Sequence, residues 1–435
     1  MAEKNMNELY EILKNETKPA FGCTEPIGAC YTAAEAYDAI GGEIKRIIVE
    51  GAGPKADDVA FPGSEMLGVE MAYALGAVCG DAKAGLEVLH NVTPEGELKA
   101  RKVAELVELH PSDEKVIGVW YEKVTVETDR GVGVAKCEGA PDGLTYKARN
   151  GEVLVDRPMS ELNKAGESPL IKYSVKDFFE FATTYPYEKL EFLLKARELN
   201  MAMAQHTLED PTVGAGFGRT LMNVGQPNEV SRAKAYAAAG CEGRMYGEPY
   251  TIMSVGGKGN VGIASSMPLI SLARDIHATD EELVRALAAS FITAITVIHR
   301  IGKAPTMCSC EVAASMGVAI GIVVLKKGTA EQAEMAVQNL VPSVFGVVCD
   351  GAKPACALRL ATSAGIAFDA AYMALNNIHL AKNQGVLSDN ADATINFLGD
   401  FALHHMVESD KALCDHMMKK RKIFPLQTIR DRERS

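Results

Sequence analysis

Apolar residues in the first third of the chain change from the period of a helix to that of a strand. They recur every three or four positions in residues 7–14 and again in residues 27–40, which predicts two helices. The apolar runs that follow are shorter, and Asp129-Arg130-Gly131 separates two of them as a hairpin turn does. The predicted strands cover residues 44–49, 116–127, 132–136 and 152–155. Residues 44–156 therefore have the pattern of a small α/β lobe.

From residue 174 onward, the apolar positions follow the helical period. Two helix starts have the spacing of a capping box, in which paired side chains satisfy free N–H groups. They are Ser174 with Asp177 and Thr279 with Glu282, and glycine-rich breaks follow at residues 255–261 and 383–386. The predicted helices cover residues 175–183, 187–209, 281–299, 311–325, 329–340, 354–376 and 391–407.

Together, these patterns predict a helix-rich α+β fold. A chain of 435 residues is too long for one small core, so two domains or lobes are expected. Residues 1–43 and 160–435 are predicted to form a mostly helical domain from both ends of the chain. Residues 44–159 are predicted to form the small α/β lobe inserted between them.

Composition and charge narrow the classes of partner. The chain has 45 Lys and Arg against 57 Asp and Glu, a net charge of -12, which argues against a nucleic-acid or anionic-membrane surface. The N-terminus is polar and charged, unlike a signal peptide. The apolar stretch at residues 283–298 contains Arg285 and is predicted to be a buried helix, not a membrane span. We expect a cytoplasmic protein without nucleic-acid or membrane partners, and a homo-oligomer is left open.

The ten cysteines do not have the character of a disulfide framework in a chain of this kind. Half of them are scattered, and we interpret these as small buried hydrophobic residues: Cys30, Cys79, Cys137, Cys241 and Cys414. The other half lie among glycines and prolines: Cys23, Cys308, Cys310, Cys349 and Cys356. This second group holds the candidate chemistry.

Three of these cysteines, Cys310, Cys349 and Cys356, lie at predicted helix starts or turns. Cys310 opens an alanine-rich helix, and Pro354 as a first helical residue puts Cys356 in the first helical turn. A helix N-terminus favours thiolate over thiol, and thiolates bind metals. The spacing of Cys308 with Cys310 and of Cys349 with Cys356 matches neither zinc knuckles nor ferredoxin motifs. A cluster, a zinc ion and buried cysteines without a metal therefore all remain open from spacing alone.

Cys23 lies in a different setting, Gly22-Cys23-Thr24-Glu25-Pro26, directly before a predicted helix. A cysteine there has a lowered pKa and suits a base or nucleophile, although a packed turn cysteine fits the local sequence equally well. Glu25 is typical of a solvated carboxylate in a first helical turn. The run Gly256–Gly262 lacks the features of a nucleotide-binding loop, and a carboxylate-binding loop or a tight turn is favoured.

At these same residues, the chain resembles the L-cysteine desulfidase family, which is related to the alpha part of bacterial iron–sulfur L-serine dehydratases. The resemblance runs through nearly the whole chain. It is carried by Lys18–Pro26, Gly257–Gly262, Asn396–Met406 with Glu408-Ser409-Asp410, and most specifically by Val348–Leu358.

The resemblance implies a 4Fe–4S cluster that three cysteines hold, with one iron open to substrate. Cys349 and Cys356 correspond to two ligands. The third is Cys308 or Cys310, and we favour Cys308 because related dehydratases have a cysteine three residues before a Glu-Val pair, here Glu311-Val312. Cys310 remains open, since its position at a helix start suits a ligand equally well.

The resemblance also implies Cys23 as general base and a small amino acid as substrate. Thr24, Glu25 and Asn260 are the expected substrate-binding residues. The implied reaction is elimination of sulfide from L-cysteine to give pyruvate, ammonia and hydrogen sulfide. Some serine dehydratases have a C-terminal cysteine on the open iron, whereas this sequence ends Arg430-Asp-Arg-Glu-Arg-Ser435, so that iron is expected to be free.

Three other functions remain open at this point. Because iron accepts oxygen as well as sulfur, the substrate could be L-serine, with water eliminated. A cluster-bearing sensor or sulfur-trafficking protein without turnover is a second alternative, and a structural zinc protein is a third.

Overall fold

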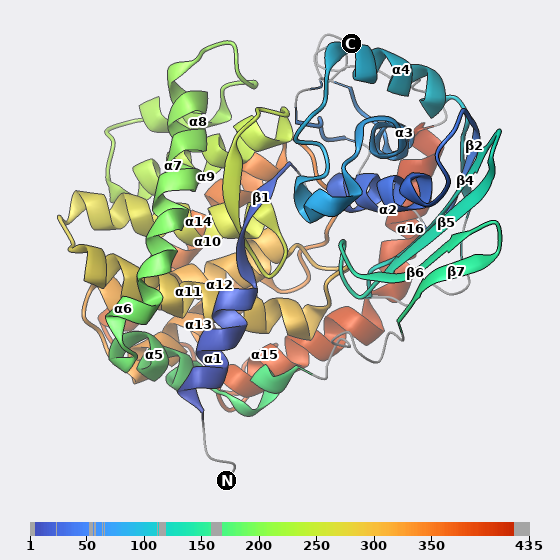
Figure 1. The fold of residues 1–435 in the computed structure, drawn as a ribbon. Helices are drawn as coiled ribbons and strands as arrows, with labels where there is room; N and C mark the ends of the chain where they lie inside the picture. The colour runs from blue at the N-terminus through green and yellow to red at the C-terminus, as the bar shows by residue number, and fades with distance from the viewer. Residues whose placement is uncertain are drawn as a thin grey trace.

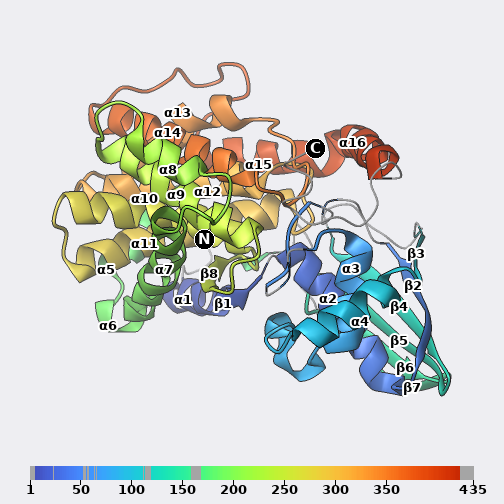
Figure 2. The same cartoon turned by 90° about the horizontal axis from the view of Figure 1, so that it is seen from above.

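The computed structural model describes residues 5–22, 24–51, 55, 58–62, 64, 66–110, 112, 119–157 and 168–421, with the backbone alone for Thr24, Glu25 and Arg421. Helices dominate these residues and a small sheet lies to one side, which confirms the predicted helix-rich α+β fold (Figure 1). A view from above shows the helical body and a smaller lobe side by side (Figure 2).

Within the described residues, the lobe contains a six-stranded sheet in the order β3-β2-β4-β5-β6-β7. Its strands are β2 Ile44–Glu50, β3 Val107–His110, β4 Tyr121–Thr128, β5 Gly131–Glu138, β6 Leu144–Arg149 and β7 Glu152–Asp156. β2 and β3 are parallel and the other neighbours antiparallel. β4 and β5 form the predicted hairpin. The patterns missed β6, because its buried positions, Thr145 and Ala148, contrast little with their neighbours.

Helix α2 (Thr24–Ile40) packs on strands β4, β5 and β6, with α3 (Val69–Cys79) on α2 and α4 (Pro94–Ala104) on α3. The approach is close: a Cβ at Gly133 of β5 would lie 2.1 Å from the Ala36 carbonyl oxygen. The buried residues of α2 therefore belong to the core of the lobe. The predicted boundary at residue 44 had left this helix with the helical domain, and the small alanines of α2 explain its fit to the sheet. The division into domains otherwise stays a prediction.

The helical body packs around α11 and α12, which contact each other most extensively and are surrounded by α5, α10, α13, α14 and α15. Its first helices are α1 Met6–Asn15, α5 Val175–Thr184, α6 Tyr187–Leu190, α7 Leu194–Glu209, α8 Phe217–Asn223 and α9 Glu229–Met245. They are followed by α10 Gly259–Asp275, α11 Asp280–Ile301, α12 Ser309–Leu325, α13 Ala330–Val344, α14 Cys356–Leu375, α15 Ala391–Asp400 and α16 Val407–Arg421. Short 3-10 segments cover Ala82–Glu87, Pro169–Lys172 and Glu191–Leu193, and Phe401–His405 is a π-helical turn.

Both predicted capping boxes are present, at the starts of α5 and α11. The helix predicted over residues 187–209 is divided by the 3-10 turn at 191–193, and the one over residues 391–407 by the π turn. Helices α8 and α9 were not predicted. α9 is buried almost all round in its C-terminal half, so its sequence has no polar face to reveal a helical period.

Helix α11 is, among the described residues, the one helix long and apolar enough to cross a membrane. In this fold, 89% of its most apolar 18-residue window is buried inside the protein. The stretch at residues 283–298 is thus the core helix that its interrupted apolar pattern predicted.

A two-stranded sheet joins the N-terminal segment to the helical body. β1 (Thr17–Phe21) pairs antiparallel with β8 (Thr251–Val255), from Thr17–Val255 to Phe21–Thr251. Helix α10 then turns back along β8, and a Cβ at Gly262 would lie 1.9 Å from the Met253 carbonyl oxygen. Only glycine permits this approach, so Gly262 brings the start of α10 close to the end of β1.

Candidate active site

Two loops that are distant in sequence pair in the helical body and hold the four clustered cysteines. The Cys308 N–H donates to the Val347 carbonyl over 2.8 Å, and the Cys349 N–H donates to the Thr306 carbonyl over 2.8 Å. Met307 and Val348 form an isolated β-bridge between these bonds. The pairing therefore places Cys308 and Cys349 on adjacent strands of chain.

The same loops lead into two helix N-termini. Cys308 is the N-cap residue of α12, and its carbonyl accepts from the Val312 N–H over 2.8 Å. Cys356 is the first residue of α14, as its position after Pro354 predicted. Both helices are longer than four turns, and the partial positive charge at their N-termini stabilises anionic sulfur.

Cys308 and Cys310 interact directly. A hydrogen bond from the Cys310 side chain, with a smaller contribution from the positive charge of Arg359, lowers the pKa of Cys308 to about 7. The same contact and burial raise the pKa of Cys310 well above its ordinary value. Of the two, Cys308 is therefore the one whose thiolate form the contact favours.

Cys356 completes the group. Its side chain is 5% exposed and contacts the Gly351 carbonyl over 3.5 Å. Burial raises its pKa to about 12, and the charges of Cys308 and Cys349 act in the same direction. All four predicted cysteines thus lie in one neighbourhood, where deprotonation of one affects the others.

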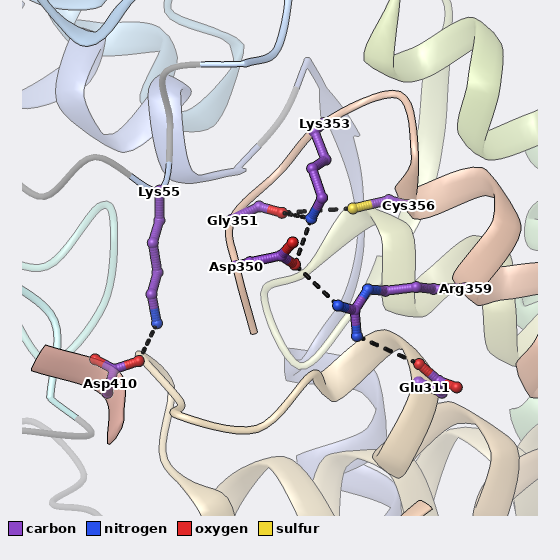
Figure 3. A network of polar contacts seen from close by, with 8 residues as sticks. All are labelled: Lys55, Glu311, Asp350, Gly351, Lys353, Cys356, Arg359 and Asp410. Atoms are coloured by element: carbon purple, nitrogen blue, oxygen red, sulfur yellow. Dashed lines mark hydrogen bonds and ion pairs between the residues drawn. The ribbon is translucent and has the colours of Figure 1, made fainter. Parts of the chain in front are cut away.

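Cationic side chains lie close to the cysteines, and Figure 3 shows Lys353 and Arg359 in the neighbourhood of Cys356. Arg359, one turn into α14, bonds Asp350 over 3.0 Å and Glu311 over 3.5 Å. Lys353 contacts the Asp350 carboxylate and donates to the Gly351 carbonyl over 3.1 Å. These contacts connect the start of α12, the loop before α14 and α14 itself, and they bring positive charge close to the cysteines.

Lys55 reaches this region from the lobe, between β2 and α3. Its ammonium group lies 2.6 Å from the Asp410 carboxylate of α16 and 3.4 Å from the Pro305 carbonyl oxygen (Figure 3). Its own carbonyl accepts from the Ala352 N–H over 2.9 Å. A Cβ at Gly351 would lie 2.4 Å from that carbonyl oxygen, so glycine is required there. Lys55 thus joins the lobe, both cysteine loops and the C-terminal helix.

The side chains present suit a thiolate-ligated cluster. The donors are sulfur atoms at two helix N-termini, and the charged residues beside them include three cations, Lys55, Lys353 and Arg359. Soft thiolate ligands favour iron–sulfur clusters, zinc and copper(I), and nearby positive charge stabilises an anionic cluster. Across the described ranges, no three Cys, His, Asp or Glu side chains converge as the ligands of a single metal ion do.

Of the other predicted site residues, the structure describes the side chain of Asn260 alone. Cys23 is outside the described residues. Thr24 and Glu25 are the first two residues of α2, and only their backbone is described. Asn260, in the first turn of α10, is 6% exposed and accepts from Nη1 of Arg244 over 2.7 Å. Nη2 of Arg244 donates to the Gly22 carbonyl over 2.6 Å. Asn260 and the residue before Cys23 thus meet at one guanidinium.

Arg244 is the residue that the sequence patterns missed. It lies near the C-terminus of α9 and is 3% exposed. The available signal was a charged residue between Gly243 and Met245 in a segment of small and apolar residues, which implies a buried cation once the helix is known. Without a predicted helix there, that signal had no structural meaning.

A cleft of about 440 Å³ lies between the lobe and the helical body. The lobe contributes Trp120 and Asp142, while the body contributes Glu16 and the loop Gly256–Lys258 before α10. Its volume is in the range of small-molecule sites. The cleft therefore reaches from the interface to the start of the helix that carries Asn260.

The chain is similar to known proteins over nearly all of its length. The UPF0597 protein CBO1815 of Clostridium botulinum strain Hall is 31% identical over 428 residues, which cover 96% of this chain and 99% of that protein. A UPF0597 protein of Phocaeicola vulgatus is 30% identical, covering 97% of this chain and 99% of the other. One of Photobacterium profundum is 32% identical, covering 95% and 99%.

The model of the serine dehydratase alpha chain family matches residues 83–415. The match includes both cysteine loops, Arg244 and Asn260. The relation expected from the motifs around Cys349 and Cys356 is thereby confirmed. By this match over most of its length, the chain belongs to the serine dehydratase alpha chain family.

Proposed function

We propose that the chain is an iron–sulfur-dependent lyase that eliminates sulfide from L-cysteine, giving pyruvate, ammonia and hydrogen sulfide. The observation that carries the proposal is the gathering of four cysteines at the N-termini of α12 and α14, among cationic side chains. Membership of the serine dehydratase alpha chain family supports a lyase. A small amino acid is the proposed substrate, and the cleft has room for one.

Cys349, Cys356 and Cys308 are the proposed ligands of a 4Fe–4S cluster. The lowered pKa of Cys308 supports it as the third ligand, because a metal binds the thiolate. Cys310, which donates to Cys308 and whose pKa is raised, is the alternative third ligand. When bound, the cluster supplies a Lewis acid, an open iron that polarises the substrate's β-substituent as a leaving group.

The chain's own residues perform the remaining steps. Cys23, as a thiolate, takes the α-proton, and the electrons of the Cα–H bond form the Cα–Cβ double bond as the Cβ–S bond breaks. The sulfur leaves as sulfide, and the aminoacrylate product hydrolyses to pyruvate and ammonia. Arg244 bonds both the Gly22 carbonyl and Asn260, which connects the residue before Cys23 with the start of α10. Thr24, Glu25 and Asn260 are proposed to contact the substrate.

L-Serine dehydratase activity is the second candidate, and the family match favours it specifically. The same residues would act on L-serine, with water as the leaving group. A sensor or sulfur-trafficking protein and a structural zinc protein are the alternatives without turnover.

One experiment separates these functions. The protein is purified under anaerobic conditions, and its iron, zinc and labile sulfide are measured. Sulfide release from L-cysteine and pyruvate formation from L-serine are then assayed side by side. We expect iron, labile sulfide and release of sulfide from L-cysteine. Turnover of L-serine alone indicates the dehydratase, iron without turnover indicates the sensor, and zinc without iron indicates a structural site.

A further inference from the structure

Arg244 is a cation buried without an acidic partner among the described side chains. Its guanidinium is 3% exposed and bonds two neutral oxygens, the Asn260 side-chain oxygen and the Gly22 carbonyl. Its Nε is buried and has no hydrogen-bond partner. Since burying a charge without an opposite charge is unfavourable, the site favours an anion that completes it.

A helix N-terminus adds positive potential at the same place. A Cβ at Gly259, the first residue of the 17-residue helix α10, would lie 2.3 Å from Cζ of Arg244. The guanidinium therefore packs directly on the start of the helix. The N-cap residue, Lys258, makes no side-chain capping bond. Proteins bind carboxylates with the N–H groups at a helix N-terminus and with the two parallel N–H bonds of an arginine guanidinium, and both are present here.

The cleft between the lobe and the body reaches the loop directly before this helix start. Its lining includes Gly256, Gly257 and Lys258, the three residues directly before α10. The Gly22 carbonyl, which accepts from Arg244, belongs to the residue before Cys23. Arg244 therefore bonds the residue that precedes the proposed base in the sequence, and it packs on the helix whose preceding loop lines the cleft.

We propose that Arg244, together with the N-terminus of α10, binds the α-carboxylate of the amino-acid substrate. This inference rests on the proposed function for the identity of the ligand. Asn260 then acts as a positioning residue, because its side-chain oxygen holds Nη1 of Arg244 and orients the guanidinium. The site selects ligands that carry a carboxylate, whatever the group at the β-carbon.

Binding is tested on metal-free protein, so that the result does not depend on turnover. L-Alanine, which has no leaving group, and ethylamine, which has no carboxylate, are compared as probes by thermal shift. We expect L-alanine but not ethylamine to raise the melting temperature of the wild-type chain, and Arg244→Met to abolish the rise. Arg219→Met is the matched control, because its guanidinium bonds only backbone carbonyls, such as those of Thr207 and Asp210. Equal responses of wild type and Arg244→Met to L-alanine, including none from either, overturn the proposal.

Kinetics on the reconstituted enzyme give the second measurement. Arg244→Lys keeps the cation but loses the forked geometry, so we expect KM for L-cysteine to rise about tenfold with iron content unchanged. This variant also decides the question if Arg244→Met does not fold: an unchanged KM overturns the proposal. If the wild-type protein has no turnover but binds L-alanine through Arg244, the carboxylate site stands and the proposed function fails.

Discussion

Removing single cysteines separates the two roles proposed for them. Cys349 lies in the paired loops beside Cys308, whereas Cys23 follows Gly22, whose carbonyl accepts from Arg244. A ligand and a base fail differently, because losing a ligand removes the cluster and losing a base leaves it in place.

We therefore expect Cys23→Ala to keep its iron and its visible absorbance but to lose roughly 100-fold or more of its activity, the usual contribution of a general base. Cys349→Ala should lose both iron and activity. Iron analysis and a sulfide assay measure the two effects. Cys79→Ala, in the lobe at the end of α3, is the control and should keep both. A fully active Cys23→Ala would show that another group is the base.

Glu16 is a buried carboxylate whose pKa depends on the charged side chains beside it. Its Oε1 lies 2.7 Å from Nε2 of His299, whose Nδ1 lies 2.6 Å from the Ser168 hydroxyl. Lys303 lies 3.8 Å from its other oxygen. Burial acts to raise the pKa of Glu16, but the contact with His299 and the charges of His299 and Lys303 outweigh it, so the pKa is below its ordinary value of 4.5.

A carboxyl group with a lowered folded-state pKa stabilises the fold above the unfolded-state value, and this contribution is lost as the pH falls through the folded-state value. Glu16→Gln should therefore lower the free energy of unfolding by about 1–3 kcal/mol at neutral pH. The difference from wild type should shrink as the pH falls below 4.5. Urea unfolding across this range measures it, and a difference that is constant with pH would contradict the assignment.

At the scale of elements, the sequence predicted helix starts correctly where the residues that form them are close in the chain. Among the helices whose caps the structure describes, four have complete capping boxes, with the N-caps Ser174, Asn228, Thr279 and Thr329. The boxes at Ser174 and Thr279 were predicted, because their acidic partners are three positions away and the bonds form within one turn. Strand β1 was not predicted, because its partner β8 is more than two hundred positions away and only tertiary pairing reveals it.

Thr279→Ala should lower the free energy of unfolding by about 1 kcal/mol, since it removes the bond from the Glu282 N–H at the start of the central helix α11. Thr362→Ala is the matched control. Thr362 is exposed inside α14 and bonds only the Leu358 carbonyl of its own helix, so its removal should cost less than about 0.5 kcal/mol. Urea unfolding of the two variants compares them, and equal losses would mean that the cap contributes nothing of its own.

At the scale of the whole molecule, Lys55 is the contact that connects the lobe with the cysteine loops. It contacts Pro305 and Ala352 of the two loops and Asp410 of α16, and Figure 3 shows the contact with Asp410. Because these segments are distant in sequence, one side chain and one carbonyl hold together parts of the chain that no single helix connects. Through Lys55, the lobe thus helps to hold the two cysteine loops of the candidate active site in place.

Lys55→Met should loosen both cysteine loops without unfolding the protein. We expect amide hydrogen exchange in residues 305–310 and 349–356 to accelerate at least about threefold, because the contacts of the Lys55 ammonium group between these segments are lost. Lys55→Arg should restore slow exchange. The control is Lys147→Met, in which a lysine of the same lobe loses its 2.6 Å ion pairs with Glu35 and Asp38. If Lys55→Met and Lys147→Met exchange at the same rates in these loops, the Lys55 side chain does not stabilise them.

The sequence by itself determined the features that depend on near neighbours. The period of apolar residues predicted the fold class, the hairpin and most long helices, because burial of one face leaves a repeating pattern. Pro354 and its surroundings put Cys356 at a helix start for a similarly local reason. The motifs around Cys349 were specific enough to indicate the family.

The tertiary structure alone decided which of these parts meet. It paired the Cys308 and Cys349 loops, gave Cys308 rather than Cys310 the lowered pKa, and moved α2 into the core of the lobe. It also placed Arg244 between Gly22 and Asn260, which no local pattern contains. The physical reason is the same in each case: hydrogen bonds and charges between distant segments depend on distances in space, and the sequence states only distances along the chain.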